Sequence, residues 1–250
     1  MRKAIRIKLW QQMPNYRKPA SFLVKESYPL PPYSTVIGMV HAACGFTEYH
    51  DMDLCIQGRN ASDASDYAIM YQFAPCKLDK DIDKATGEII PRGWKVIDEE
   101  NGKKTAIHRS PKSVHVLTDV ELLIYIWPKN NDDFEIILNS LTKPVSFLSL
   151  GRYEDIVRID EVAEVLLEEC DDAYKSPYDM YVPANIMEVN DTCIGTLYTL
   201  GKKFGYRESK SGSFREWEEV VTVMHISADT IITSDDIFYD KSLNLPVCFA

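Results

Sequence analysis

The chain of 250 residues lacks the cysteine spacing that a disulfide framework or a zinc ribbon requires. Its six cysteines are scattered, without a CxxC pair or a regular interval, and we therefore expect a reduced protein in the cytoplasm. No apolar run approaches the thickness of a bilayer, and the amino-terminal MRKAIRIKLW has no apolar core of signal-peptide length. The sequence predicts a soluble protein with no targeting segment and no membrane partner.

The common catalytic and cofactor motifs are absent as well. The sequence has no Walker lysine loop, no GxSxG and no HExxH. His41, Cys44, His50 and Cys55 are zinc-ligand types, but their irregular spacing matches no closed zinc site. The adjacent carboxylate pairs, such as DD and EE, diverge in regular structure and do not converge on one metal. We expect neither a metal nor another cofactor.

Charge is distributed unevenly along the chain. The net charge is −10, yet residues 1–47 carry seven basic side chains against one acidic, a net charge of +6 that leaves −16 for the remainder. Because phosphate binding depends on local charge, and salt screens charges beyond about 8 Å, the basic end can bind RNA while the acidic remainder faces elsewhere. An ordinary solvated amino terminus is the alternative, and charge alone does not distinguish the two.

Hydrophobic patterns predict a mixed α and β fold with a substantial core, since 45% of the residues are hydrophobic. Strands are predicted over residues 4–10, 67–74, 113–127 and 145–150, of which 113–127 is one long strand or a bent pair. Helices are predicted over residues 35–44, with Ser34 as the N-cap and Gly45 as the stop, and from Asp132 to the residue before Pro144.

The polar segment 76–111 contains TGE and NGK turn signals and predicts an inserted hairpin. The resulting order of elements is the βαββαβ pattern of a ferredoxin-like sheet with two helices on one face. We therefore predict an α+β fold, with a ferredoxin-like domain over 1–157 and a β-rich C-terminal extension over 158–250. Within the extension, 196–204 and 217–227 read as strands, whereas 160–169 fits a short helix or a strand.

A short stretch near the amino terminus concentrates basic and aromatic side chains. Its cations and hydroxyls can contact phosphates, and the start of the predicted helix, directly after a rigid PLPP entry, attracts anions. Its aromatic rings can stack on unpaired bases, although Phe22 and Tyr28 also fit core or loop anchors. The candidate contacts are Tyr16, Arg17, Lys18, Ser21, Lys25, Tyr33, Ser34 and Thr35.

A second group of candidates lies near the return of the predicted hairpin. His108 and His115 flank Arg109 and Lys112, so these side chains can contact RNA. The histidines can also act as acid or base in a metal-independent cleavage of RNA. Simple exposed residues are the alternative.

Four motifs in combination resemble the Cas5 family of CRISPR-associated RAMP proteins, and the type I-B branch most of all. They are IRIKLW, YRKPASF, ESYPLPPYSTVIGMVHAACG and FLSLGRYEDIV. The similarity is clearest over residues 4–46 and 145–157. The family supplies the subunit of the Cascade surveillance complex, an antiviral defence, that caps the 5′ handle of the guide RNA.

The resemblance implies an RRM-related ferredoxin-like domain in which 76–111 is a protruding thumb. It implies as partners the CRISPR RNA 5′ handle, the Cascade backbone subunit and the large subunit, with target DNA contacted only indirectly. By the same resemblance Ser34 and Thr35 would lie near the RNA. Gly151 and Arg152 would belong to the family's glycine-containing loop, where glycine permits a close backbone approach.

One branch of the family, type I-C, cuts precursor RNA with a tyrosine, a lysine and a histidine, the last two adjacent. This sequence has no Lys-His dipeptide, and Lys112 and His115 fall on opposite faces of a regular strand. We therefore expect a noncatalytic RNA-binding subunit. The alternatives are a metal-independent endoribonuclease that uses His108 or His115, and an interaction domain that binds no RNA.

Overall fold

The computed structural model describes residues 1–22, 24–75, 80–82, 85–87, 89–91, 94–97, 104–170, 174–186, 195–209, 212–232 and 237–250. Its helices are α1 (Tyr33–Cys44) and α2 (Asp132–Thr142). The strands up to α2 are β1 (Arg2–Gln11), β2 (Val24–Lys25), β3 (Met52–Arg59), β4 (Ser62–Pro75), β5 (Lys80–Ile82), β6 (Ile89–Pro91), β7 (Trp94–Ile97), β8 (Lys104–Thr118) and β9 (Val120–Pro128). After α2 follow β10 (Arg158–Cys170), β11 (Tyr174–Lys175), β12 (Asp179–Pro183), β13 (Gly195–Ser209), β14 (Gly212–Ile226), β15 (Ile231–Ile232), β16 (Ile237–Asp240) and β17 (Leu245–Val247).

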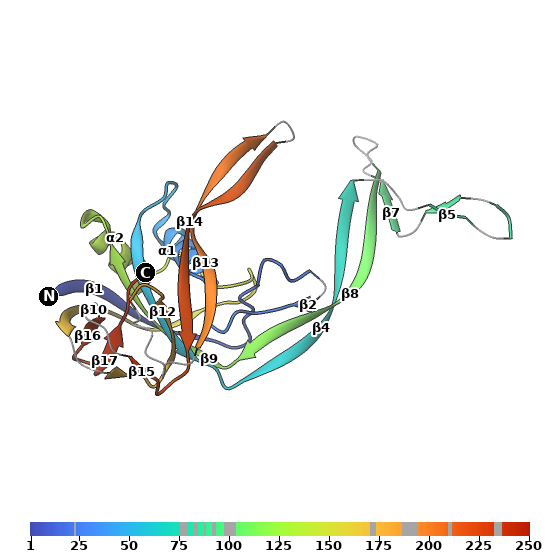
Figure 1. The fold of residues 1–250 in the computed structure, drawn as a ribbon. Helices are drawn as coiled ribbons and strands as arrows, with labels where there is room; N and C mark the ends of the chain where they lie inside the picture. Colours follow the sequence, from blue (N-terminus) through green and yellow to red (C-terminus); the bar gives the residue numbers. More distant parts are fainter. Residues whose placement is uncertain are drawn as a thin grey trace.

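A nine-stranded sheet forms the body of the molecule, in the order β13-β14-β12-β3-β9-β1-β10-β16-β17 (Figure 1). β1 lies between β9 and β10 and is antiparallel to both, and β3 is antiparallel to β9. The later strands extend the sheet beyond β3 on one side and beyond β10 on the other. The predicted boundary after residue 157 thus falls directly before a strand of the central sheet, and the β-rich segment that follows continues the same sheet.

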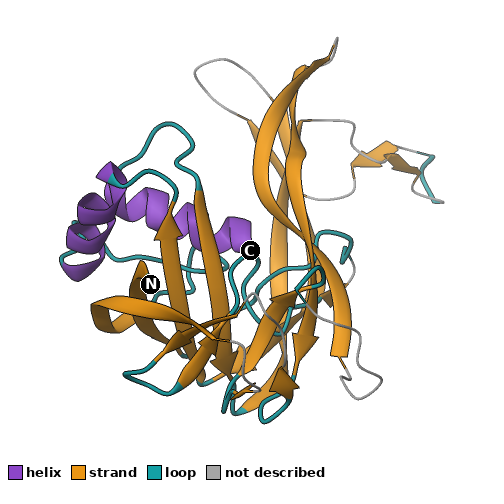
Figure 2. Cartoon of the chain, turned by 60° about the vertical axis from the view of Figure 1, so that its left-hand side comes forward, coloured by secondary structure: helices purple, strands orange, loops and turns teal. Residues whose placement is uncertain are grey.

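Both helices cover one face of this sheet (Figure 2). Ile5, Ile7 and Leu9 alternate along β1 and pack in one core with the apolar faces of α1 and α2, as the sequence predicts. The opposite face of the sheet packs against the C-terminal segment, which supplies Val247 and Phe249 to a second core. Neither α1 nor α2, the helices in the described part of the chain, is long and apolar enough to cross a membrane.

The first helix starts earlier than its pattern predicts. α1 begins at Tyr33, with Pro32 as the residue before it and no side-chain hydrogen bond at the cap. The prediction that Ser34 is the N-cap is therefore wrong, because the fixed φ of Pro32 already starts the helix. The predicted end is confirmed, since the last helical residue is Cys44 and Gly45 follows it.

One strand assignment from the sequence is also wrong, and one strand was missed. Residues 145–150 form no strand, only a single bridge between Ser149 and Ile156, and the strand that follows α2 in the sheet is β10. β3 was not predicted, because five consecutive residues from Leu54 to Gly58 are buried and leave no alternation of polar and apolar side chains. The predicted strand 67–74 exists within β4, but β4 belongs to a separate sheet.

β4 and β8 form a long two-stranded ribbon that projects from the body (Figure 1). Their antiparallel register runs from Ser62 with Thr118 to Pro75 with Thr105, so the insertion begins well before residue 76 and ends after residue 111. Within the predicted hairpin 76–111, residues 76–79, 83–84, 88, 92–93 and 98–103 lie outside the described residues. Asp119, with φ 52°, separates β8 from β9, which confirms the bent pair.

A cluster of charged and polar side chains attaches β16 to β1. The Arg6 guanidinium donates to Asp240 at 2.6 Å and also contacts Glu161, and the Tyr125 hydroxyl donates to Asp240 at 2.9 Å. Although burial acts to raise it, hydrogen bonds from Ser242, Arg6 and Tyr125 hold the pKa of Asp240 below its usual value. The C-terminal strands are thus joined to the central sheet by a buried ion pair.

We expect Asp240→Asn to lower the free energy of unfolding at neutral pH by about 3 kcal/mol, because it leaves the buried Arg6 without one of its carboxylates. The pKa of Asp240 is lower in the folded protein than in the unfolded chain. The difference in unfolding free energy between wild type and variant should therefore reach its full size above about pH 3.9, the pKa of an unfolded aspartate, and disappear as the pH falls through the lower pKa of the folded state. Urea unfolding measures both effects. Asp160→Asn, which removes the exposed pair with Arg158, is the control and should cost less than about 1 kcal/mol; equal losses in the two variants would refute the role of Asp240.

Candidate nucleic-acid interface

Arg17, Lys18 and Lys25 lie on a tight loop, residues 16–28, which we call the basic loop; the other basic residues near the amino terminus are on β1. The Tyr28 N–H donates to the Tyr16 carbonyl at 2.7 Å, and the Lys18 N–H donates to the Glu26 carbonyl at 2.9 Å, so the two ends of the loop run side by side. The Ser21 hydroxyl donates to the Lys18 carbonyl at 2.6 Å and closes the turn. In this structure the Ser21 hydroxyl therefore stabilises the backbone of the loop.

The basic loop is attached to the projecting ribbon. β2, at the end of the loop, pairs in parallel with β8 through Val24 with Ser113 and Lys25 with Val114. The Asn15 side-chain amide donates to the Lys25 carbonyl at 3.0 Å and also contacts the His115 carbonyl. These contacts fix the position of Lys25 relative to β8.

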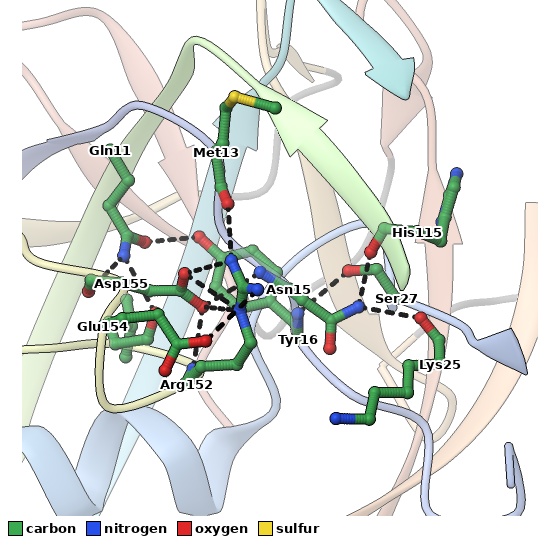
Figure 3. A network of polar contacts seen from close by, with 11 residues as sticks. Gln11, Met13, Asn15, Tyr16, Lys25, Ser27, His115, Arg152, Glu154 and Asp155 are labelled. Atoms are coloured by element: carbon green, nitrogen blue, oxygen red, sulfur yellow. Dashed lines mark hydrogen bonds and ion pairs between the residues drawn. The ribbon is translucent and has the colours of Figure 1, made fainter. Parts of the chain in front are cut away.

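The loop of the LGRYED sequence, residues 150–155, supports the basic loop from the other side (Figure 3). The Asp155 carboxylate accepts the Asn15 N–H at 3.1 Å and the Arg152 N–H at 2.8 Å. The Arg152 guanidinium donates to Asp155 at 2.7 Å and to the Met13 carbonyl at 3.1 Å. Arg152 was predicted to contact RNA, but in the structure its guanidinium is engaged by Asp155 and orients the chain that leads into the basic loop.

Tyr16 and Tyr33, both predicted to contact RNA, are buried in the core, which leaves neither ring a surface on which a base could stack. The Tyr16 hydroxyl donates to Gln11 at 2.7 Å, and the Gln11 amide donates to the carbonyls of Leu150 and Asp155. Burial raises the pKa of the Tyr16 and Tyr33 phenols well above their usual value. Aromatic residues in a basic segment fit both a core and a stacking role, and the sequence has no signal that separates the two.

Phe22, by contrast, is 73% exposed at the tip of the basic loop. Tyr28 is half-buried and packs edge-on against Tyr198 of β13, with ring centroids 5.5 Å apart. Of the four aromatic candidates in this segment, Phe22 is the one whose ring is open to a base.

Positive charge gathers around Lys25. Its pKa is lowered, first by burial and then by the positive charges of Arg17, Arg152 and Lys112, which Glu154 only partly offsets. Arg17 is exposed, whereas Lys25 and Lys112 are half-exposed. These cations come from three distant parts of the sequence, and their mutual repulsion favours an anion between them.

The other predicted residues lie elsewhere on the surface. Ser34 and Thr35 are in the first turn of α1, where the Thr35 N–H donates to the Pro32 carbonyl at 3.0 Å. Arg109 is exposed on β8 opposite Tyr71, and Lys112 lies opposite Ala68, so the two cations occupy opposite faces of the ribbon. His108 lies on the same strand, but its side chain is outside the described residues.

Two features of the ribbon bear on the predictions made from sequence. Tyr67, Ile69 and Tyr71 are exposed on one face of β4, and sequence reasoning missed them although their alternation is the signal that places them on one face. His115 lies 3.6 Å from Asp63, and the uninterrupted register of β8 keeps it on the face opposite Lys112. The lysine and histidine are therefore not side by side.

The residues considered for zinc do not converge. His41 accepts the His50 N–H, His50 pairs with Asp133 at 2.8 Å, and Cys55 is buried in the core on the other face of the sheet. In the part of the chain that the structure describes, no three His, Cys, Asp or Glu side chains are grouped to hold a metal ion.

Gly151 has φ +109°, a conformation that L side chains rarely adopt. A Cβ atom there would lie 2.9 Å from both the Asn15 carbonyl oxygen and Asp155 Oδ2. The close approach that this glycine permits is thus between the LGRYED loop and the chain that enters the basic loop.

A family model matches most of the chain, and solved structures share its fold. Residues 4–201 match the family described as CRISPR-associated protein (Cas_Cas5). A subunit of a "CRISPR RNA-guided surveillance complex" has a similar fold, with a TM-score of 0.51, 17% identity and 91% of each chain covered. A CRISPR protein from Archaeoglobus fulgidus aligns with a TM-score of 0.45 and 11% identity over 98% of this chain and 97% of that one. No curated protein sequence matches the chain.

We expect Gly151→Ala to lower the free energy of unfolding by about 1–3 kcal/mol, because it strains the backbone and drives a methyl group into Asn15 and Asp155. Gly38→Ala is the matched control: it lies in α1 with open space where the methyl group would go, and should be neutral or stabilise the protein by about 0.5–1 kcal/mol. Urea unfolding of both variants tests the prediction, and a neutral Gly151→Ala would contradict it.

Proposed function

Because the chain belongs to the Cas5 family of CRISPR-associated proteins, we propose that it is a noncatalytic RNA-binding subunit of a type I, I-B-like Cascade complex, which caps the 5′ handle of the CRISPR RNA. The observation that carries this proposal is the cluster formed by Arg17 and Lys25 of the basic loop with Lys112 of the adjoining β8, where pairing of β2 with β8 and the contacts of Asp155 hold the loop in place. Its partners are the handle, the backbone subunit and the large subunit, and target DNA only indirectly.

The chemistry of the basic loop suits a single-stranded RNA. Exposed and half-exposed cations supply phosphate contacts, and the exposed ring of Phe22 supplies a surface on which an unpaired base can stack. Residues 1–47 carry a net charge of +6 against −16 in the remainder, so positive charge is concentrated at this end of the sequence.

We interpret β1-α1-β3-β9-α2-β10 as a ferredoxin-like βαββαβ unit. The supporting observations are the order β3-β9-β1-β10 with antiparallel neighbours throughout, and two helices on one face. In this interpretation the β4–β8 ribbon is the thumb. The basic loop then lies between the unit and the thumb, since β1 leads into it and β2 pairs with β8.

We expect Arg17→Ala combined with Lys18→Ala to weaken binding of the cognate handle RNA and to flatten its salt dependence. Each lost phosphate contact removes about 0.7 from the slope of log K against log salt for a single strand, so the pair should remove about 1.4. Fluorescence anisotropy over a series of salt concentrations measures both quantities.

The control for this test is Lys3→Ala combined with Lys241→Ala, which changes the net charge equally but removes cations from the start of β1 and the turn between β16 and β17. It should leave the slope unchanged. If both double variants lose the same affinity and slope, the attraction is a property of net charge and the basic loop is not the handle site.

We also propose that the protein does not cut RNA. Supporting this, His115 faces Asp63 on one side of the ribbon while Lys112 lies on the other side. Purified protein incubated with its cognate repeat RNA in EDTA should leave the RNA intact, as judged on a denaturing gel. Site-specific cleavage that disappears in His115→Ala or His108→Ala would instead establish the endoribonuclease.

A further inference from the structure

The β13–β14 hairpin extends beyond the rest of the sheet (Figure 1). β12 pairs with β14 only from Val223 to Ile226, whereas β13 and β14 pair with each other as far as Ser209 and Gly212. In the part of the chain that the structure describes, no other strand pairs with the outer part of this hairpin. Residues 204–209 and 212–217 of this outer part are exposed, apart from the half-buried Gly205, so side chains on both faces are open to solvent.

One face of the outer hairpin is aromatic. Phe204 lies directly opposite Trp217, and Tyr206 lies directly opposite Arg215, so these four side chains share a face. The Phe204 and Tyr206 rings are 5.8 Å apart and nearly perpendicular, and the Arg215 guanidinium lies 4.5 Å from the centre of the Phe204 ring. Tyr206 is 65% exposed and Trp217 about half exposed.

The position of Trp217 depends on a glycine. A Cβ atom at Gly201 would lie 2.5 Å from the Trp217 ring, so the indole rests directly on the backbone of β13. A tryptophan held flat against a strand keeps its other face available. The aromatic face is thus a defined surface whose open rings are those of Tyr206 and Trp217.

The ion pairs of the outer hairpin lie on one of its two faces. On that face, opposite the aromatic one, Glu218 pairs with Lys203 at 2.8 Å and Glu216 pairs with Arg207 at 3.5 Å. On the aromatic face, from Phe204 to Glu208 and from Ser213 to Trp217, the one carboxylate is Glu208. Among the described residues Arg215 has no carboxylate partner, so the aromatic face presents an unneutralised cation beside its open rings.

We propose that this face, formed by Phe204, Tyr206, Arg215 and Trp217, is a second binding site for single-stranded nucleic acid. Tyr206 and Trp217 stack on unpaired bases and Arg215 contacts a phosphate. Tyr206 and Trp217 are diagonal neighbours on the two paired strands, a separation of about 7–8 Å that suits bases splayed out of a helical stack. The position of Glu216 and Glu218 on the opposite face, which leaves Glu208 as the one carboxylate beside Arg215, favours an anionic strand as the ligand.

The new site lies apart from the basic loop. Tyr28 of the loop packs against Tyr198, which lies six residues before Phe204 on β13, or about 20 Å along the strand, and which belongs to the core on the helix side of the sheet. Trp217, by contrast, lies against Gly201 on the other face of the hairpin. The site therefore does not depend on the loop for its chemistry, and it can be tested without it.

The test uses the full chain carrying Arg17→Ala and Lys18→Ala, so that failure of the handle site does not obscure the result. In this background Tyr206→Ala and Trp217→Ala should each weaken binding by about 5- to 150-fold, which is the usual contribution of one aromatic–base stack. Tyr206→Phe should retain affinity because the ring is kept. Fluorescence anisotropy with labelled oligouridylate and oligothymidylate measures binding to RNA and DNA separately.

Phe214→Ala is the matched control, because Phe214 is an exposed aromatic residue on the opposite face of the same hairpin, and it should not change affinity. Thermal unfolding verifies that each variant is folded, and Tyr206→Ala decides the matter if loss of Trp217 disturbs β13. A loss confined to one oligonucleotide assigns the site to RNA or to DNA. Unchanged affinity of folded Tyr206→Ala for both oligonucleotides overturns the proposal, as does an equal loss in Phe214→Ala.

If folded Tyr206→Ala binds both oligonucleotides normally but no longer associates with the purified backbone or large subunit, the aromatic face is a protein-docking surface and the proposal is overturned. Because the experiment is performed without Arg17 and Lys18, its outcome is independent of whether the basic loop binds the handle.

Discussion

The carboxylate of Asp155 is the group on which the candidate interface depends. It is almost fully buried, and it accepts hydrogen bonds from the Asn15 backbone and from both the backbone and the guanidinium of Arg152. A buried carboxylate requires such partners, so the LGRYED loop and the chain before the basic loop can hardly move independently. Asn15 in turn reaches the carbonyl of Lys25, and through this chain of contacts one carboxylate determines where Lys25 lies.

The central sheet was predictable where one face of an element is buried and the other is not. β1, α1 and α2 have that arrangement, and their patterns gave the correct element type. β3 is buried on both faces and β10 has mixed exposure, so neither shows a clear alternation, and 145–150 was assigned in place of β10. The length of the ribbon could not be predicted either, because β4 and β8 are held by pairing with each other across more than thirty residues of separation.

In the candidate site, too, residues identified by a local pattern were predictable and residues that depend on distant contacts were not. Arg17 and Lys25 were identified from local charge, and both lie on the basic loop. The roles of Tyr16 and Arg152 could not be predicted, because each depends on residues far away in sequence. Tyr16 is buried in the core between the sheet and the two helices, and the Arg152 guanidinium donates to the Met13 carbonyl. A cation in a family motif can bind a ligand or hold a loop in place. Only the position of Asp155 relative to Asn15 shows that Arg152 holds a loop.

The projecting elements are stable because the sheet holds their bases. An isolated two-stranded hairpin is marginally stable in water, but β14 continues into pairing with β12, and β8 leads through Asp119 into β9 at the centre of the sheet. The basic loop contacts the β4–β8 ribbon through β2, and the base of the β13–β14 hairpin through Tyr28 on Tyr198, whose partner Val223 on β14 also pairs with β12. A strand of nucleic acid bound to the loop would therefore lie between two projecting β-ribbons whose bases are joined by one rigid sheet. The outer part of the β13–β14 hairpin is held by the pairing of its own two strands, whereas the β4–β8 ribbon is also held by β2 and by Asn15, and is thereby linked to the contacts of Asp155.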